Sequence, residues 1–279
     1  MDEIRCPASI AAPFVDWTWL ARHRSEVVVA DARWYLDGSS ARTAYESGHI
    51  PGAVFVDHDA WLSGEAGEGG LNPLPDPAVF AQGMSSLGIG DDTTVVAYDD
   101  AGGVIAARLV WMLRALGRNA ALLDGGLSAW VGPLEAQSIE PTPAVFTPSA
   151  WPEELIVGPD QLQDASITVI DARNPDRFDG TLQVPSDPRP GHISGAVNVP
   201  CRAHLNSNGQ LKPMDEIRDA FASVGVLNAA DVVSYCGSGV TACHNLLTLE
   251  HAGLGIGRLY PGGWSEYALD PNRPAATTE

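Results

Sequence analysis

The second half of this chain repeats the first. Three motifs recur in the same order: DAR at 31–33, GHI at 48–50 and VVAY at 95–98 return as DAR at 171–173, GHI at 191–193 and VVSY at 232–235. The copies are spaced by about 140 residues, which is the length of a domain and far longer than a solenoid repeat. A chain of 279 residues with this duplication is predicted to fold as two tandem domains.

Each repeat alternates short apolar runs with helical patterns, which predicts an α/β fold with a mainly parallel sheet flanked by helices. Strands are expected near 27–31, 53–56, 94–98 and 120–123, and again near 168–171, 196–199, 232–235 and 257–260. Helices of the first repeat are expected near 42–47, 77–87, 102–117 and 126–131. Five prolines between 131 and 152 indicate an extended connector. The predicted domains span 1–135 and 154–279, with a linker at 136–153.

The most informative loop follows the expected strand at 232–235. It begins with Cys236 and continues as Gly-Ser-Gly, after which an amphipathic helix is expected to begin at Val240. The first N–H groups of a helix have no intrahelical partner, and a glycine-rich loop lets them converge on an anion. Thiols in such positions ionise more readily than free cysteine, whose pKa is about 8.5. We therefore expect Cys236 to be a thiolate nucleophile at neutral pH.

The first repeat lacks this nucleophile. Asp99 follows its matching strand, in the position that Cys236 occupies in the second repeat. An aspartate cannot perform thiol chemistry, so the catalytic domain is expected to be the second. The first domain is expected to support and shape the site.

Charge and cysteine content narrow the possible partners and the compartment. The formal net charge of −19 disfavours binding to nucleic acid or anionic membranes, so an anionic substrate must be held by local groups. The four cysteines have no metal-ligand spacing, and neither a signal peptide nor a long apolar run is evident. We expect a cytoplasmic protein that uses no metal or organic cofactor.

The tandem DAR and GHI motifs and the loop CGSGVTA at 236–242 resemble the rhodanese-type sulfurtransferases over essentially the whole chain. The loop is most similar to that of the 3-mercaptopyruvate sulfurtransferases. Thiosulfate-using members usually have basic residues after the cysteine, where this chain has Gly237 and Ser238. The resemblance implies that a small anionic donor transfers sulfur to Cys236, forming a persulfide. The outer sulfur of the persulfide is then accepted by cyanide or by a thiol, such as that of a thioredoxin-like protein.

The resemblance also implies roles for individual residues. Cys236 is assisted by Ser238 and by a first-domain carboxylate, for which Asp59 is the candidate and Asp57 its rival. Arg177 binds the donor carboxylate; Arg189 is the candidate for a second arginine, because Ser186 stands near its usual position. The backbone N–H groups from Gly237 to Ala242 are expected to form an anion cradle that stabilises the thiolate and the persulfide. The substrate-binding candidates in this loop are Gly237, Gly239, Val240, Thr241 and Ala242. A histidine that relatives often carry in the first-domain loop is replaced by Leu71-Asn72.

Several other residues are interpreted structurally. Because they recur in both repeats, Arg33 and Arg173 are expected to form ion pairs, and His49 and His192 to form hydrogen bonds. Cys243 is expected in the core, Cys201 has no assigned role, and Trp264 is expected either to form a pocket wall or to pack in the core.

Other functions remain open at this point. A cysteine phosphatase or arsenate reductase would need an arginine six residues after the cysteine, where this chain has Ala242. A thiosulfate:cyanide sulfurtransferase and a non-catalytic persulfide carrier are the remaining alternatives. Donor, acceptor and oligomeric state are not determined by the sequence.

Overall fold

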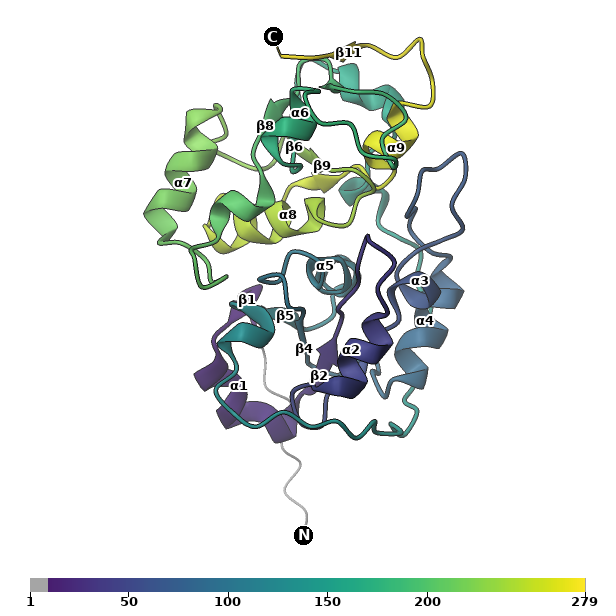
Figure 1. Ribbon diagram of the computed structural model, residues 1–279, viewed down its shortest axis with the longest axis vertical. Helices are drawn as coiled ribbons and strands as arrows, with labels where there is room; N and C mark the ends of the chain where they lie inside the picture. The colour runs from purple at the N-terminus through teal and green to yellow at the C-terminus, as the bar shows by residue number, and fades with distance from the viewer. Residues whose placement is uncertain (1–9, 279) are drawn as a thin grey trace.

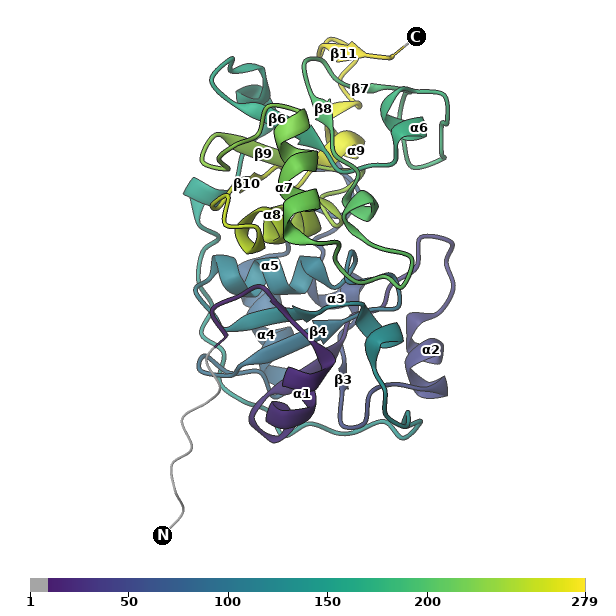
Figure 2. The ribbon, with the colours of Figure 1, turned by 90° about the vertical axis from the view of Figure 1, so that its left-hand side faces the viewer.

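The computed structural model describes residues 10–278, so Cys6 and most of the stretch inspected for a signal peptide lie outside it. The chain forms two α/β halves, one stacked on the other (Figure 1). Helix α5 (Ala107–Ala115) of the first half packs against α8 (Ala242–His251) of the second. Figure 2 shows the same two helices facing each other across the seam.

The first half contains one parallel sheet with strand order β1-β5-β4-β2-β3. Its strands are β1 (Phe14–Val15), β2 (Val28–Asp31), β3 (Val54–Phe55), β4 (Val95–Tyr98) and β5 (Ala120–Leu123). The other helices are α1 (Trp17–His23), α2 (Ala41–Ser47), α3 (His58–Trp61) and α4 (Pro77–Ser86), with 3₁₀ turns at Arg24–Glu26 and Gly126–Ala129. Every residue of β4 is buried, as expected for a parallel strand covered on both faces.

The second half repeats this plan with a parallel sheet ordered β10-β9-β6-β8 and a small antiparallel pair, β7 and β11. Its strands are β6 (Thr168–Asp171), β7 (His192–Ile193), β8 (Val197–Asn198), β9 (Val232–Tyr235), β10 (Arg258–Leu259) and β11 (Ala275–Ala276). Its helices are α6 (Pro175–Phe178), α7 (Met214–Ser223), α8 and α9 (Gly263–Tyr267), with 3₁₀ turns at Glu153–Leu155, Pro159–Gln163 and Cys201–His204.

The predicted α/β class and the mainly parallel sheets are confirmed, and three element assignments are corrected. Helix α5 begins at Ala107, because residues 101–106 wrap around the Asp99 carboxylate before the helix starts. The segment near 126–131 is a short 3₁₀ turn at Gly126–Ala129, and α8 begins at Ala242 instead of Val240. Strand β1 and the β7–β11 pair were not predicted, since two-residue strands carry no readable periodicity.

The proline-rich connector contains no helix or strand from 136 to 152 and crosses the outer surface of the first half before it enters the second (Figure 1). It is attached by packing and hydrogen bonds: Phe146 is buried, with its ring 5.6 Å from that of Phe80, and Thr147 binds the Asp91 carboxylate. The connector is thus an extended segment attached to the surface of the first half.

One hydrophobic cluster contains side chains from both halves, among them Leu109 and Met112 of α5 and Leu246 and Leu249 of α8. An ion pair between Arg114 and Glu250 also crosses the seam. The shared core fixes one half against the other, so first-half residues can contribute to a site on the second. No helix in the described residues has the length and apolar character that a bilayer crossing needs.

Candidate active site

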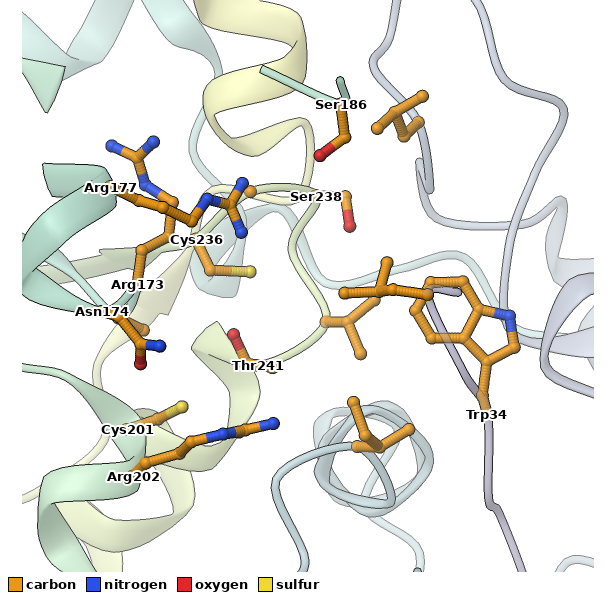
Figure 3. A pocket seen from close by; sticks show the side chains of 16 residues that line it. Trp34, Arg173, Asn174, Arg177, Ser186, Cys201, Arg202, Cys236, Ser238 and Thr241 are labelled. Carbon is orange, nitrogen blue, oxygen red and sulfur yellow. The ribbon is translucent and has the colours of Figure 1, made fainter. Parts of the chain in front are cut away.

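A cavity of about 190 Å³ lies at the seam between the halves, and Cys236 forms part of its wall (Figure 3). The loop at 236–241 and the carboxyl ends of β6 and β8 supply most of the lining, as is usual for ligand sites in open α/β sheets. The second half contributes Ala172, Arg173, Asn174, Arg177, Ser186, Cys201, Arg202, Cys236, Gly237, Ser238, Val240 and Thr241. The first half contributes Trp34, Leu36, Leu71 and Ile105.

The loop at 236–241 is held from behind by the start of α9. The carbonyl groups of Cys236 and Gly237 accept hydrogen bonds from the N–H groups of Trp264 and Ser265, each at 2.8 Å. Within the described chain, the N–H groups of residues 237–242 donate to no protein acceptor. The loop therefore carries six backbone donors that an anion could use.

The duplicated loop of the first half shows what this backbone arrangement binds. The Asp99 carboxylate is fully buried and accepts four backbone hydrogen bonds, from Ala101, Gly103, Ile105 and Ala106, at 2.7–2.8 Å. Burial raises the pKa of Asp99, and these four donors oppose that rise by stabilising the carboxylate. The first half thus fills its own anion cradle with a side chain.

The match between the two loops extends to their supports. The carbonyl group of Asp99 accepts from the Leu127 N–H at 2.7 Å, as that of Cys236 does from Trp264. Gly102 and Gly239, three residues after the respective loop starts, have φ of 78° and 75°. A thiol therefore occupies, in the second half, the position from which a carboxylate binds the cradle in the first.

Cys236 is almost fully buried, with 2% of its surface exposed, and its sulfur points into the cavity (Figure 3). Ser238 and Thr241 line the same cavity, and in Figure 3 the Ser238 hydroxyl lies on the side of the first half. Thiol and serine thus line the same cavity, as the sequence predicts.

Arg177 reaches the cavity from α6. Its Nε donates to the Asp187 carboxylate at 2.9 Å, its Nη2 binds the other oxygen of that group, and Asp187 is buried. This two-point pairing fixes the guanidinium plane. A Cβ on Gly237 would lie 3.0 Å from Nη2, so glycine there allows the arginine to approach the loop at 236–241.

The other two lining arginines differ in their partners. Arg173 pairs with Asp171 at 2.6 Å, as Arg33 pairs with Asp31 at 2.6 Å, which confirms the predicted structural ion pairs. Arg202 is exposed and, within the described chain, forms no side-chain hydrogen bond or ion pair with protein groups. It is therefore the cavity arginine whose charge is not compensated by a carboxylate.

Neither of the two candidate carboxylates of the first half lines the cavity, and of the predicted loop residues Gly239 and Ala242 also lie outside the lining. The Asp59 carboxylate is exposed and accepts from Trp34 Nε1 at 2.9 Å; a hydrogen bond from His58 lowers its pKa. It therefore contacts the cavity wall from outside. Its rival Asp57 caps the N-terminus of α3, accepting from Ala60 N–H at 3.1 Å.

Arg189 does not line the cavity either. Its Nη2 donates to the carbonyl groups of Asp270 and Arg273, at 3.2 and 2.8 Å, and its guanidinium lies 5.6 Å from the Trp264 ring centre. The returning C-terminal segment holds this side chain, so it does not take the place of the missing second arginine.

The remaining structural expectations are confirmed. His49 and His192 bind the carbonyl groups of Tyr45 and Phe178 through Nδ1, each at 2.7 Å. Cys243 lies in the core, where burial raises its pKa to about 12. Trp264 is fully buried and packs in the core, outside the cavity lining.

The sequence reasoning missed part of the lining, chiefly Arg202, Asn174 and Trp34. Asn174 directly follows the repeated DAR motif, and Arg202 lies a few residues after β8. Both therefore come from the carboxyl ends of strands, where ligand sites in such sheets gather, and that rule could have identified them. Nothing local to Trp34 indicates that it faces the other half.

Comparison with known proteins gives consistent matches along both halves. The family model for the rhodanese-like domain matches residues 15–133 and 159–270. A probable 3-mercaptopyruvate sulfurtransferase from Pseudomonas aeruginosa is 39% identical over 267 residues, covering 90% of this chain and 93% of that protein. A putative thiosulfate sulfurtransferase, SseB, from Mycobacterium tuberculosis is 36% identical over 259 residues, covering 89% of this chain and 90% of that protein.

Among solved structures, the 3-mercaptopyruvate sulfurtransferase from Leishmania major matches with a TM-score of 0.86 and 34% identity, covering 94% of this chain and 75% of that chain. Matched relatives thus include proteins named for both donors, and the fold agrees over nearly the whole length.

Proposed function

The chain belongs to the rhodanese-like family and is a sulfurtransferase, and from this premise we propose that it transfers sulfur from 3-mercaptopyruvate to a thiol through a persulfide on Cys236. The observation that carries the proposal is the pair of matched loops. One half binds a carboxylate with its loop N–H groups, and the other presents a buried thiol at the same place, beside Arg177.

The reaction has two displacements. The Cys236 thiolate attacks the donor sulfur, the carbon–sulfur bond breaks, and its electron pair remains on the pyruvate enolate, which then takes a proton. Ser238 lines the same cavity, and its hydroxyl would donate a hydrogen bond to the developing enolate. An acceptor thiolate next attacks the outer sulfur of the persulfide, and Cys236 leaves again as the thiolate.

The loop backbone stabilises the anionic states of Cys236. The N–H groups of Gly237, Ser238, Gly239, Val240, Thr241 and Ala242 have no protein acceptor within the described chain. Pre-oriented donors of this kind stabilise charge without reorganising during the reaction. The persulfide anion would accept backbone hydrogen bonds from this loop, as the Asp99 carboxylate does in the first half.

Arg177 and Arg202 are the cations that would bind the donor carboxylate. Asp187 fixes the orientation of Arg177 but offsets part of its charge, whereas Arg202 has no such partner in the described chain. Asp59 would act indirectly, by holding the Trp34 ring at the cavity wall through its 2.9 Å hydrogen bond. We assign Arg189 no contact with the donor.

Donor preference is tested by measuring kcat/KM for 3-mercaptopyruvate and for thiosulfate with the same thiol acceptor. Gly237 and Ser238 add no cation next to the sulfur, so we expect a preference for 3-mercaptopyruvate of at least about tenfold. A preference for thiosulfate would reverse the donor assignment. Absence of turnover with both donors would favour the persulfide-carrier alternative.

Replacing Arg177 with alanine is expected to raise KM for 3-mercaptopyruvate by about tenfold and to change kcat less, because the lost contact binds substrate and transition state alike. The measurement is steady-state kinetics at fixed acceptor concentration. The control is Arg22→Ala, on the exposed surface of α1, which changes the net charge by the same amount at a position far from the cavity. An unchanged KM in Arg177→Ala would remove this residue from the donor site.

A further inference from the structure

Arg108 of α5 is a buried cation from the half that lacks the cysteine. Its side chain has 0% exposed surface, and it donates hydrogen bonds to three backbone carbonyl groups. Nε binds Leu62 at 3.3 Å, Nη2 binds Asn72 at 3.0 Å, and Nη1 crosses the seam to Gly239 of the catalytic loop at 3.0 Å. No carboxylate in the described chain pairs with it.

An unpaired charge in this position needs an explanation, because burying a cation without an anion is costly. Burial lowers the pKa of Arg108, and the groups that oppose this effect are the thiols Cys243 and Cys236. Cys243 stays protonated at neutral pH, because burial raises its pKa to about 12, and its sulfur donates to the Gly239 carbonyl at 3.4 Å. The other thiol, Cys236, begins the loop whose Gly239 carbonyl Arg108 binds, so geometry connects the buried cation to this residue.

The bond to Gly239 also orients the cradle. In a trans peptide the carbonyl and the following N–H point in opposite directions. By holding the Gly239 carbonyl on its own side, Arg108 directs the Val240 N–H away from itself. The duplicated N–H in the first half is that of Gly103, which donates to the Asp99 carboxylate at 2.7 Å.

A buried cation at this position is not needed for the helix to fold, because the duplicated helix of the second half lacks one. The duplicated position in α8 is Asn245, also fully buried and uncharged, and its amide binds the Val199 carbonyl of its own half at 2.8 Å. The buried cation therefore occurs where the partner loop carries a cysteine.

We propose that Arg108 is a positioning residue through which the first half serves catalysis, providing the buried counter-charge for the Cys236 thiolate and persulfide and fixing the Val240 N–H toward them. This inference rests on the proposed function only in identifying those two anionic states. The first half is then an electrostatic component of the site as well as its wall.

The test is the pH dependence of Cys236 alkylation by iodoacetamide in the full chain, without donor, read by peptide mass spectrometry because other cysteines are present. In Arg108→Met, we expect the half-maximal rate to move to higher pH and the rate at pH 7 to fall about tenfold. Arg108→Lys keeps the charge but loses the three-carbonyl arrangement. Its alkylation profile should therefore stay near wild type while kcat falls.

Arg114→Met removes another α5 arginine at the seam, one that is paired with Glu250, and should leave the profile unchanged. An Arg108→Met profile identical to wild type in a folded protein would overturn the inference. If Arg108→Met does not fold, Arg108→Lys decides. In Arg108→Lys, a shifted alkylation profile together with a wild-type kcat would contradict the inference. Because alkylation needs no donor, failure of the sulfurtransferase assignment would appear separately, as absent turnover in wild type.

Discussion

Cys236→Ser is expected to abolish sulfur transfer, lowering kcat by at least about 10³-fold, while leaving the fold intact. The hydroxyl nearly matches the thiol in size, so the buried site should accept it, but serine cannot form or release a persulfide. The measurement is pyruvate release from 3-mercaptopyruvate at saturating thiol, with circular dichroism to confirm folding. Residual turnover above a few per cent would contradict a mechanism through this sulfur.

Two further variants sharpen this result. Cys243→Ala removes the neighbouring core thiol, and we expect it to cost about 1–2 kcal/mol of stability while preserving turnover. Cys236→Asp introduces the residue that the first half has at the matching position, Asp99. It should be inactive, yet melt no lower than Cys236→Ser, because its carboxylate can accept the loop N–H bonds that Asp99 accepts.

Gly239→Ala is expected to lower kcat/KM by about 10²-fold and to destabilise the protein by several kcal/mol. Gly239 has φ of 75°, and a Cβ there would collide with the Pro261 carbonyl oxygen and lie 2.9 Å from its carbon. The backbone must therefore shift, which displaces the loop N–H groups and the carbonyl that Arg108 holds. Denaturant unfolding and steady-state kinetics measure the two effects.

Gly195→Ala is the matched control. Gly195 has φ of 85° in the same half, but a Cβ there would have no heavy atom within 4 Å. It should lose only the roughly 1–2 kcal/mol of left-handed strain, with activity close to wild type. If both variants kept wild-type activity, loop geometry would not set the rate.

The features predicted correctly are those encoded within each half. The DAR motif yields the Asp31–Arg33 pair and its copy Asp171–Arg173, because both partners lie two residues apart at one strand end. The repeated GHI motif likewise yields two equivalent histidine hydrogen bonds, at His49 and His192. Duplication made these predictions robust, since each pattern was read twice in one chain.

Other missed or misassigned residues depend on how distant segments meet. Trp34 and Arg108 reach the site only because α5 packs on α8, and no local pattern in the first half specifies that docking. Arg189 was misplaced because the C-terminal carbonyl groups of Asp270 and Arg273 return to bind it. The comparison of Asp99 with Cys236 predicted the candidate site, but the four backbone hydrogen bonds to Asp99 could be seen only in the structure.

The central claim is tested most directly by mixing the protein with one equivalent of 3-mercaptopyruvate in the absence of an acceptor and measuring its mass. The account predicts the gain of one sulfur atom, located on the peptide that contains Cys236, together with one pyruvate per chain. The added sulfur should leave when a thiol is supplied. Pyruvate release with no sulfur on the chain, or sulfur on a different cysteine, would contradict it.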